Sequence, residues 1–453
     1  MGNKINKTYI IPITAMLGAG LLLTACNNGS NEDKLANMTN KSVQVDKKTN
    51  KNSEKDKKDL ENTIKSLNNF SGKTFNELIK YNFAKNDFNS QIYSPYSYLS
   101  ALELLYDNSY YSKDNELAKY KDIDLGKYNY DNVKSENIAL VDIKKGADKN
   151  KIKKLNNFKS VKFPKQAEEE SKKLQKRVLD EVILEPKYDD PDLSLILLNA
   201  TRFEGVWAKK FDKNLTEEES YTLLDGKTTK TKMMHSENLA KADSSLGYED
   251  KEVQIYKKPV STAENMNKTK EDDLIKRTGD VYIINPKGLG ADLGKNKKII
   301  ENISKNIEKY VNEFGEKAEK YDDIYVDMPK LDIKNDINLG EIAKKNNKKF
   351  ILDDYDLKES TGMKDMQKIS SILQAVSLKL DEEKVDAKAA TQINMMTTSL
   401  ELNKKEMYIK ADHPHFIVIT AKNENKDKDK DSTVEKEKES IIFMAFVNNP
   451  TQK

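Results

Sequence analysis

Cysteine, histidine and tryptophan are scarce in this chain of 453 residues, which has one Cys, three His and one Trp. The single cysteine, Cys26, lies close to the amino terminus. The rest of the chain therefore has no disulfide and no thiol for Cys–His catalysis or a thiolate zinc site. His413 and His415 flank a proline, and no third histidine accompanies them, so we expect a structural role for both. We predict no cofactor, no metal and no enzyme activity.

An excess of charge of either sign is also absent. The chain has 78 Lys and Arg against 75 Asp and Glu, which leaves a formal charge of +3, and the two signs are interleaved. Phosphate binding needs a clustered basic face, so we predict no nucleic-acid partner. No linker-like break appears between Phe75 and Pro450, which predicts one large domain, expected as a monomer.

A mainly apolar stretch, Tyr9 to Leu23, follows a basic amino-terminal segment and precedes the small residues Ala25 and Cys26. It is short for a membrane span, and its end resembles a bacterial lipobox. The resemblance implies that Cys26 is lipidated and anchors the protein to the membrane at the cell surface, on the extracytoplasmic side. The alternatives are an ordinary signal peptide and a single membrane helix.

Residues 27–58 contain scarcely any large apolar side chain. Such a segment cannot bury enough surface to offset the entropy of ordering, which predicts a disordered polar tether with a reach of about 30 Å. The predicted organisation is a lipoprotein signal peptide over 1–26 that ends at Cys26, a tether over 27–58 and a folded domain over 59–453.

Hydrophobic periodicity predicts a domain of mixed helices and antiparallel strands, an α+β fold. Helices are predicted at Leu60–Leu67, Phe75–Phe83 and Tyr98–Tyr106, and the nearly continuous apolar run Leu193–Asn199 predicts a central strand covered on both faces. Further predicted strands are Val281–Ile284, Ile324–Val326, Phe416–Ile419 and Ile441–Met444. Two charged insertions, Lys257–Lys276 and Lys422–Lys438, interrupt the pattern.

The run from Asn199 to Trp207 reads Asn-Ala-Thr-Arg-Phe-Glu-Gly-Val-Trp and resembles the central-strand signature of the serpins. Ser94–Ser97, Met328–Ile333 and the closing run Ala411–Phe416 are similar to family motifs at the same order and spacing. The resemblance covers about Phe75 to Pro450. It implies a serpin-like α+β fold, in which helices pack on a large central β-sheet, with smaller sheets and an exposed reactive loop.

The segment from Asp381 to Thr391 resembles the hinge of the serpin reactive loop. In an extended strand, Val385, Ala387, Ala389 and Thr391 would share one face, and Asp386 and Lys388 would point the other way. The resemblance implies the hinge residues Glu382, Lys384, Val385, Ala387, Ala389, Ala390 and Thr391. It implies the shutter and breach residues Ser94, Ser97, Asn199, Trp207, Ser370 and Gln374. The chain departs from the family at Lys384, where most members have Gly, and at Gln374, where most have His.

The implied function is suicide-substrate inhibition of serine proteases, with cysteine proteases as a second target class. The protease would cleave the loop, and the cut strand would insert into the main sheet before the acyl-enzyme is hydrolysed. The implied scissile region is Met396, Thr397, Thr398, Ser399 and Leu400. No Lys or Arg occurs between Ala389 and Asn403, which favours elastase-, chymotrypsin- or subtilisin-like targets over trypsin-like ones.

Two other functions remain open from the sequence. The first is a surface-anchored binding protein that keeps the serpin fold without inhibition. The second is a solute-binding lipoprotein, which would need two α/β lobes around a cleft and which the Asn199–Trp207 signature disfavours.

Overall fold

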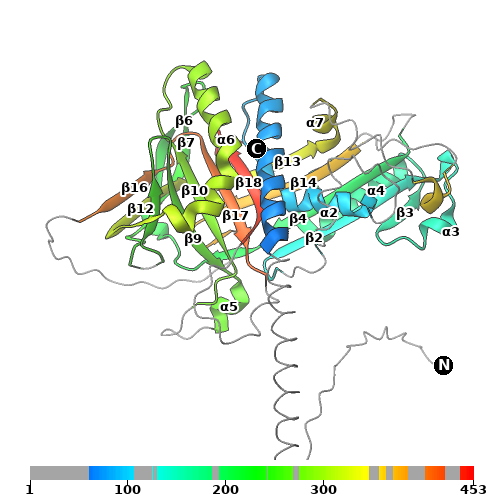
Figure 1. Cartoon of the computed structure of the whole chain (residues 1–453), viewed down its shortest axis with the longest axis horizontal. Coiled ribbons are helices and arrows are strands. Elements are labelled where there is room, and N and C mark those ends of the chain that lie inside the picture. Colours follow the sequence, from blue (N-terminus) through cyan, green and yellow to red (C-terminus); the bar gives the residue numbers. More distant parts are fainter. Residues whose placement is uncertain are drawn as a thin grey trace, which may run out of the picture. The chain divides into compact units, whose positions relative to one another are not determined.

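The computed structural model describes residues 61–106, 125, 130–185, 193–241, 243–268, 275–345, 357–363, 371–385, 404–423 and 439–452. The predicted signal peptide, Cys26 and the predicted tether lie outside these residues. Asp59–Lys453 forms one compact unit, in which helices pack against three β-sheets (Figure 1). Within the described ranges, no helix has both the length and the apolar character that crossing a bilayer requires.

The first helix runs without interruption over residues 61–84, where the sequence predicted two separate helices. The apolar pattern breaks because this part of the helix carries small residues. Ser71 and Thr74 donate hydroxyl hydrogen bonds back to the carbonyls of Leu67 and Phe70, at 2.7 and 2.8 Å. A Cβ at Gly72 would lie 2.6 Å from the Cβ of Glu308, so glycine lets this helix approach α6 closely.

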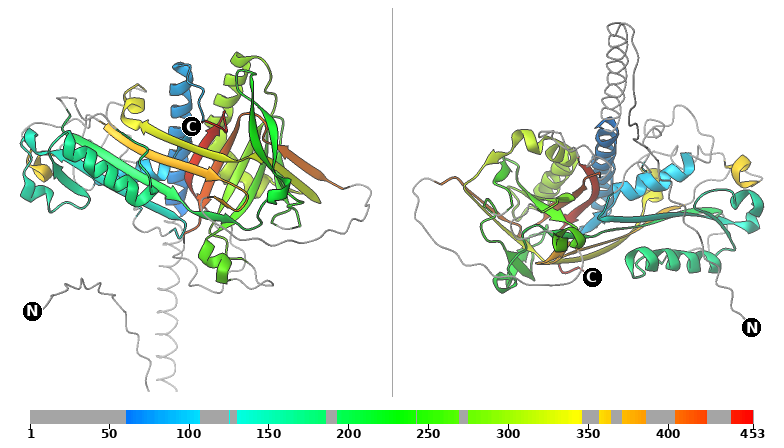
Figure 2. Two further views of the ribbon diagram at one scale, coloured as in Figure 1. Left: turned by 180° about the vertical axis from the view of Figure 1, so that it is seen from behind. Right: turned by 90° about the horizontal axis from the view of Figure 1, so that it is seen from below.

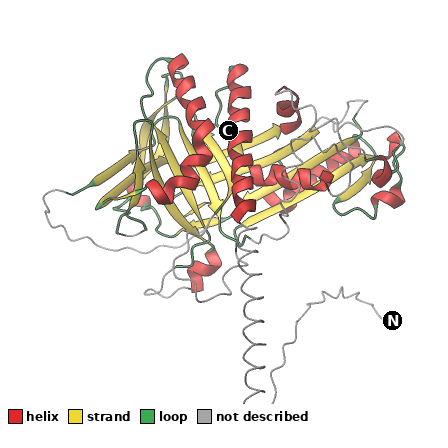
Figure 3. Cartoon of the chain, viewed as in Figure 1, coloured by secondary structure: helices red, strands yellow, loops and turns green. Residues whose placement is uncertain are grey.

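The remaining helices are short, apart from α4 and α6. They are α2 (Pro95–Tyr106), η3 (Ile143–Lys145), α3 (Lys149–Ile152), α4 (Lys165–Leu179), η4 (Lys213–Leu215), α5 (Ala263–Lys268), α6 (Leu293–Lys317), α7 (Leu339–Lys345) and α9 (Lys358–Thr361). Figure 3 shows how these helices surround the strands.

The sheet that matters most for function has the order β13-β14-β4-β2-β3 and is called the five-stranded sheet below. Its strands are β13 (Leu331–Asn338), β14 (Ser371–Leu380), β4 (Leu195–Phe203), β2 (Val133–Asp142) and β3 (Phe158–Val161). The predicted central strand is β4, which has two neighbours on each side.

Two further sheets complete the unit. The four-stranded sheet has the order β16 (Glu406–Lys410), β12 (Asp323–Pro329), β7 (Thr228–His235) and β6 (Glu217–Thr222). The nine-stranded sheet contains β1 (Gln91–Tyr93), β18 (Ser440–Val447), β17 (His415–Ala421), β10 (Gly279–Pro286), β9 (Val253–Ser261), β5 (Gly205–Trp207) and β15 (Lys384–Val385). Its last two strands, β8 (Leu246–Glu249) and β11 (Glu319–Lys320), join it beside β9.

The strands predicted from short apolar runs are all present, in β10, β12, β17 and β18. One prediction needs correction. The start of the charged segment Lys257–Lys276 belongs to β9, and Lys258 is fully buried there.

Both faces of the five-stranded sheet are covered, as the apolar run in β4 predicted. On one face Leu174 and Val178 of α4 belong to a buried cluster with Ile196 and Leu198 of β4. On the other face Leu195 and Leu197 join the main core. The second view in Figure 2 shows the sheet between α2 and α4.

Candidate functional site

The site is built around a parallel pair of strands in the middle of the five-stranded sheet. The ladder between β14 and β4 runs from the Ser371–Ile196 pair to the Val376–Thr201 pair and then stops, although both strands continue. Parallel pairing is slightly less stable per residue than antiparallel pairing. A segment that follows β14 and turned back between the two strands would run antiparallel to both. The pair is therefore the place where an added strand would gain the most hydrogen bonding.

A buried polar cluster of Ser94, Ser97, Asn199 and Gln374 lies under this pair; each side chain is at most 3% exposed. The Gln374 amide uses both of its hydrogen-bonding functions. Its Oε1 accepts from the Ser94 backbone N–H at 3.0 Å, and its Nε2 donates to the Ser94 carbonyl at 2.8 Å and to Ser97 Oγ at 2.9 Å. Glutamine thus satisfies the hydrogen bonds at this position, where most members of the family that the sequence resembles have a histidine.

The polar cluster links elements that are far apart in sequence. Ser97 Oγ donates to Asn199 Oδ1 on β4, and Ser94 Oγ donates to the Ile442 carbonyl on β18 at 2.8 Å. Thr201 Oγ1 also donates to Asn199 Oδ1, at 2.9 Å. Breaking a buried hydrogen bond is costly because the donor and acceptor are left unpaired and have no water to replace the lost partner. The cluster therefore holds β14 and β4 together against the start of α2.

The hinge, Asp381–Val385, leaves the end of β14 and is held by the backbone that follows β4. Trp207 Nε1 donates to the Asp381 carbonyl at 2.8 Å, and the Phe211 N–H donates to the Glu382 carbonyl at 2.9 Å. β15 then pairs antiparallel with β5, with Lys384 opposite Val206 and Val385 opposite Gly205. These contacts keep the hinge outside the five-stranded sheet.

Two ion pairs fix the carboxylates of the hinge. Glu382 Oε1 lies 2.6 Å from Lys330 Nζ on the other side of β14 and accepts from Thr216 Oγ1 at 2.7 Å. Burial alone would raise the pKa of Glu382, but the hydrogen bonds from Lys330 and Thr216 outweigh it and lower the pKa below its ordinary value. Glu383 pairs with Lys213 at 2.6 Å.

A third ion pair lies near the hinge and was not predicted from the sequence. Lys258 Nζ lies 2.5 Å from Asp243 Oδ2, with both side chains at most 1% exposed. The ammonium lies 5.5 Å from the Trp207 ring centroid and 5.1 Å from that of Phe211. Burial lowers the pKa of Lys258 and raises that of Asp243. The available signal was strand alternation, because Lys258 shares a face with Tyr256 and Val260, which are both fully buried.

The structure places six of the residues predicted for the hinge, shutter and breach in two groups. Hydrogen bonds join Ser94, Ser97, Asn199 and Gln374, and the hinge contacts contain Trp207 and Glu382. Lys384 and Val385 are placed by their backbone in β15. The remaining predicted residues lie outside the described residues: Ser370, Ala387, Ala389, Ala390, Thr391, Met396, Thr397, Thr398, Ser399 and Leu400.

The histidines near the carboxyl end have structural surroundings. His415 Nδ1 lies 2.9 Å from the His413 carbonyl and 3.2 Å from the Tyr221 hydroxyl. Full burial lowers the pKa of His415 to about 4. Among the residues that the structure describes, no three His, Cys, Asp or Glu side chains are grouped so that they could hold a metal ion.

Comparisons with known proteins agree with this geometry. A family model described as serpin (serine protease inhibitor) matches residues 150–427. Serpin A3-1 of Bos taurus is 25% identical over 268 residues, which are 59% of this chain and 54% of that protein. The chain thus spans about half the length of the curated relatives it matches.

Solved structures extend the match over more of the fold. The insect serpin Serpin48 of Tenebrio molitor has a TM-score of 0.60 at 15% identity and covers 86% of this chain and 98% of its own. Thyroxine-binding globulin in complex with thyroxine has a TM-score of 0.59 at 16% identity, with 86% and 99% covered.

Proposed function

The chain belongs to the serpin family, and we propose that it inhibits serine proteases as a suicide substrate, with cysteine proteases as a second target class. The matched family model is described as that of serine protease inhibitors, which supports an inhibitory rather than an enzymatic role. In the proposed mechanism a protease attacks the loop near Thr398–Ser399 and forms an acyl-enzyme. The cut segment then enters the five-stranded sheet and carries the protease with it. Insertion distorts the catalytic site of the protease before water can release the ester.

The observation that carries the proposal is the parallel β4–β14 pair with the hinge at its open end. Insertion would replace one parallel ladder with two antiparallel ladders, so the product has more backbone hydrogen bonds than the starting fold. The polar cluster and the Glu382–Lys330 ion pair would slow this step in the uncut protein. The proposed native state is thus kinetically protected rather than lowest in free energy.

Insertion requires that the residues facing the core be small. Val385, Ala387, Ala389 and Thr391 would enter on one face, and an unpaired charge among them would cost several kcal/mol, about 3 or more. Ala389→Glu and Ala390→Glu form a matched pair, because they make the same change on opposite faces. We expect Ala389→Glu to be cleaved without forming a complex, whereas Ala390→Glu keeps inhibition. Equal inhibition by both variants would rule out insertion in this register.

The proposal is tested by incubating the protein with elastase-, chymotrypsin-, subtilisin- and trypsin-like proteases and resolving the products in detergent. Stable complexes with one or more of the first three classes are expected, and none with the trypsin-like enzyme, since Ala389–Asn403 contains no Lys or Arg. If every protease gave only cleaved protein, the loop would be a substrate and the inhibitory function would be wrong.

We further propose that lipidated Cys26 anchors the protein outside the cell membrane and that residues 27–58 act as a tether. The support is the lipobox-like sequence before Cys26. Mass spectrometry of the amino-terminal peptide should show an acylated cysteine at the first position. A peptide that begins elsewhere, or that carries a free thiol, would contradict the anchor.

A second candidate is a serpin-fold binding protein without inhibitory activity. The observation in its favour is the set of hydrogen bonds that fixes the hinge on Trp207 and Phe211, together with Lys384 at a position where backbone freedom helps insertion. One matched structure is a complex with thyroxine, so the fold also serves ligand binding in another protein. The two-lobed solute-binding fold weighed from the sequence is not supported, since the fold is that of a serpin.

A further inference from the structure

Positive charge is concentrated at one end of the folded unit. Residues 143–165 contain nine lysines and a single acid, Asp148, so this segment carries +8 while the whole chain carries only +3. The segment comprises η3, α3, β3 and the start of α4. The even charge balance of the whole chain conceals this excess.

Several of these lysines have partners that hold their stems in place. Lys144 Nζ donates to the Phe163 carbonyl at 2.7 Å, Lys151 Nζ donates to the Glu359 carbonyl at 3.0 Å, and Lys159 pairs with Glu170. These contacts tie η3 to the segment after β3, α3 to α9 and β3 to α4, and of the three lysines only Lys159 has its charge neutralised.

Five other lysines are exposed: Lys149, Lys153, Lys154, Lys162 and Lys165. Within the described part of the chain, no hydrogen bond or ion pair engages their ammonium groups. Lys154 precedes β3 and Lys162 follows it, and this four-residue strand is only about 13 Å long. These five exposed lysines, which lie on α3, on the segments that flank β3 and at the start of α4, are called the lysine face below. Their mutual repulsion opposes the compact state, so the face is not explained by stability.

The chemistry of the lysine face favours a diffuse anionic surface as its partner. It contains no arginine for bidentate recognition, and Phe158 and Phe163, the aromatic residues of the segment, are buried. It therefore lacks the exposed rings on which single-stranded nucleic acid stacks. Clusters of four to eight lysines bind anionic lipid surfaces at about 1 kcal/mol for each lysine near the surface.

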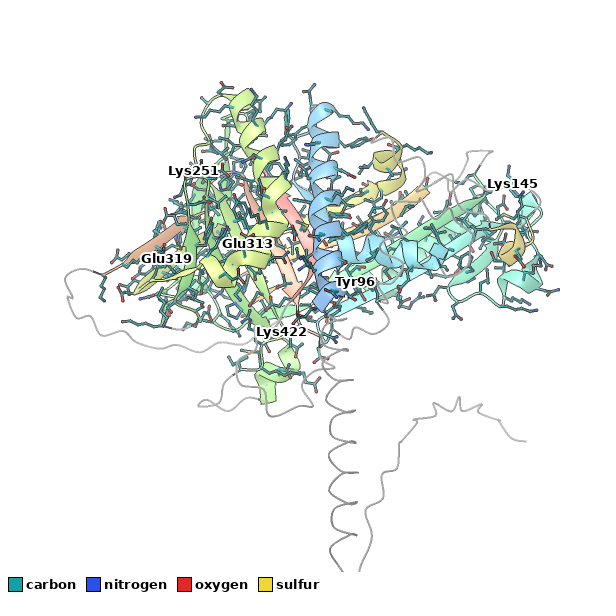
Figure 4. The ribbon with its side chains drawn as sticks, viewed as in Figure 1. Tyr96, Lys145, Lys251, Glu313, Glu319 and Lys422 are labelled. Carbon is teal, nitrogen blue, oxygen red and sulfur yellow. The ribbon has the colours of Figure 1, made fainter. Side chains whose placement is uncertain are left out.

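The position of the lysine face gives such binding a consequence. In Figures 1 and 2, α3 and β16 lie at opposite ends of the unit. Figure 4 marks one end with Lys145 and the other with Glu319, which pairs with Lys405 just before β16. β16 is the strand that follows the proposed reactive loop. A surface bound to the lysine face would leave the β16 end directed away from it.

We propose that the lysine face docks the domain on an anionic phospholipid membrane and so presents the reactive-loop end to the protease side. The choice of a membrane rests on the proposed anchor at Cys26, which would hold the domain within about 30 Å of the lipid. Docking itself is a separate property of the folded unit and can be measured without the anchor.

The test uses the full chain with Cys26→Ala, which cannot be lipidated at this position, and flotation with phosphatidylglycerol-containing vesicles. We compare it with a variant in which the five lysines of the face are changed to Gln. The matched control changes Lys251, Lys295, Lys298, Lys305 and Lys320 to Gln; these are exposed lysines elsewhere, and their loss gives the same net charge. Thermal melting and circular dichroism check that all three proteins fold.

We expect the Cys26→Ala chain and the control to float with the anionic vesicles at low ionic strength and to lose binding as the salt concentration rises. Neither should bind phosphatidylcholine vesicles. The lysine-face variant should partition more than about a thousandfold less, since each lysine near the surface contributes about 1 kcal/mol. Equal losses in both quintuple variants, no flotation of the parent, or binding to heparin, polyphosphate or DNA without binding to vesicles would overturn the proposal. Protease inhibition and Cys26 acylation are measured separately, so their failure is distinguishable from this one.

Discussion

His415 is the residue whose titration should be most visible in the stability of the fold. Burial lowers its pKa to about 4, whereas the unfolded chain takes up this proton near 6.5. Above about pH 6.5 the ring is neutral in both the folded and the unfolded chain, so its titration does not reduce stability. Between about pH 6.5 and pH 4 the unfolded chain binds the proton and the folded chain does not, so the free energy of unfolding falls. The loss from this residue should approach about 3 kcal/mol.

The measurement is the free energy of unfolding in denaturant between pH 7 and pH 4, compared between variants. His415→Asn should flatten the curve, because Asn keeps a hydrogen-bonding group near the position of Nδ1 and does not titrate. If the parent and His415→Asn had the same slope, the proton would bind elsewhere.

Substitutions of Lys384 should show whether the backbone of the proposed hinge limits the rate of insertion. Its backbone pairs with Val206, and the segment must leave this pairing and adopt new angles to enter the sheet. Lys384→Gly should speed insertion and lower the number of inhibitor molecules cleaved for each complex formed, since glycine widens the accessible backbone angles. Lys384→Ala is the control, as it removes the long charged side chain without that freedom. Equal behaviour of the two variants would show that the side chain, and not the backbone, is limiting.

At the scale of elements, the carboxyl end of α4 is tied to strands on both sides of the β4–β14 pair. On the β4 side, Arg177 Nε lies 2.7 Å from Glu136 Oε2 on β2, and Arg202 of β4 pairs with Asp180. On the β14 side, the pair is Lys334 of β13 with Glu181, at 2.5 Å. A strand that enters between β4 and β14 moves the two sides apart by about 4.8 Å. The end of α4 cannot keep both sets of contacts during that movement.

Removing the contact on one side should therefore speed insertion. We expect Lys334→Met to raise the insertion rate by up to about fivefold, the effect of losing about 1 kcal/mol from an exposed ion pair. Trp207, the only tryptophan, bonds to Asp381 in the hinge, so its fluorescence after protease addition reports the step directly. Lys172→Met breaks the Lys172–Glu185 pair, which does not bridge the strands, and should leave the rate unchanged. A similar acceleration in both variants would mean that α4 does not restrain the sheet.

The elements that could be predicted from the sequence are those whose pattern reflects burial. β4 is an almost continuous apolar run, which is typical of a strand covered on both faces, and in the structure this strand is almost wholly buried. The first helix was split in the prediction because Ser71, Gly72 and Thr74 interrupt its apolar pattern. Gly72 packs against α6, and the hydroxyls of Ser71 and Thr74 bond back to carbonyls of their own helix. Close helix packing uses small residues, and these do not contribute to hydrophobic periodicity.

The candidate site was predictable only in part, for a related reason. Ser94, Asn199, Trp207, Gln374 and Glu382 were found through family motifs, and the structure brings them to the β4–β14 pair. The Asp243–Lys258 pair was missed because strand alternation in β9 indicates only that Lys258 is buried, and nothing in the sequence connects it with Asp243. The lysine face was missed because the prediction considered the net charge of the whole chain and not that of each segment.

On the scale of the whole molecule, the proposed inhibition depends on a difference in free energy between two arrangements of the same chain. The uncut protein would keep the hinge paired with β5, and the cut protein would add a strand between β4 and β14. The polar cluster and the ion pairs of the hinge affect the rate of conversion. The extra antiparallel ladders determine its direction.

The measurement that tests this claim most directly is the melting temperature of the purified protein before and after a protease cuts the loop near Thr398. We expect a rise of more than about 10 °C on cleavage, because insertion adds several kcal/mol of stability to a large domain. The Ala389→Glu variant, cut to the same extent, should show no such rise. If the parent protein melted at the same temperature before and after the cut, no strand would have entered the sheet, and the proposed mechanism would be contradicted.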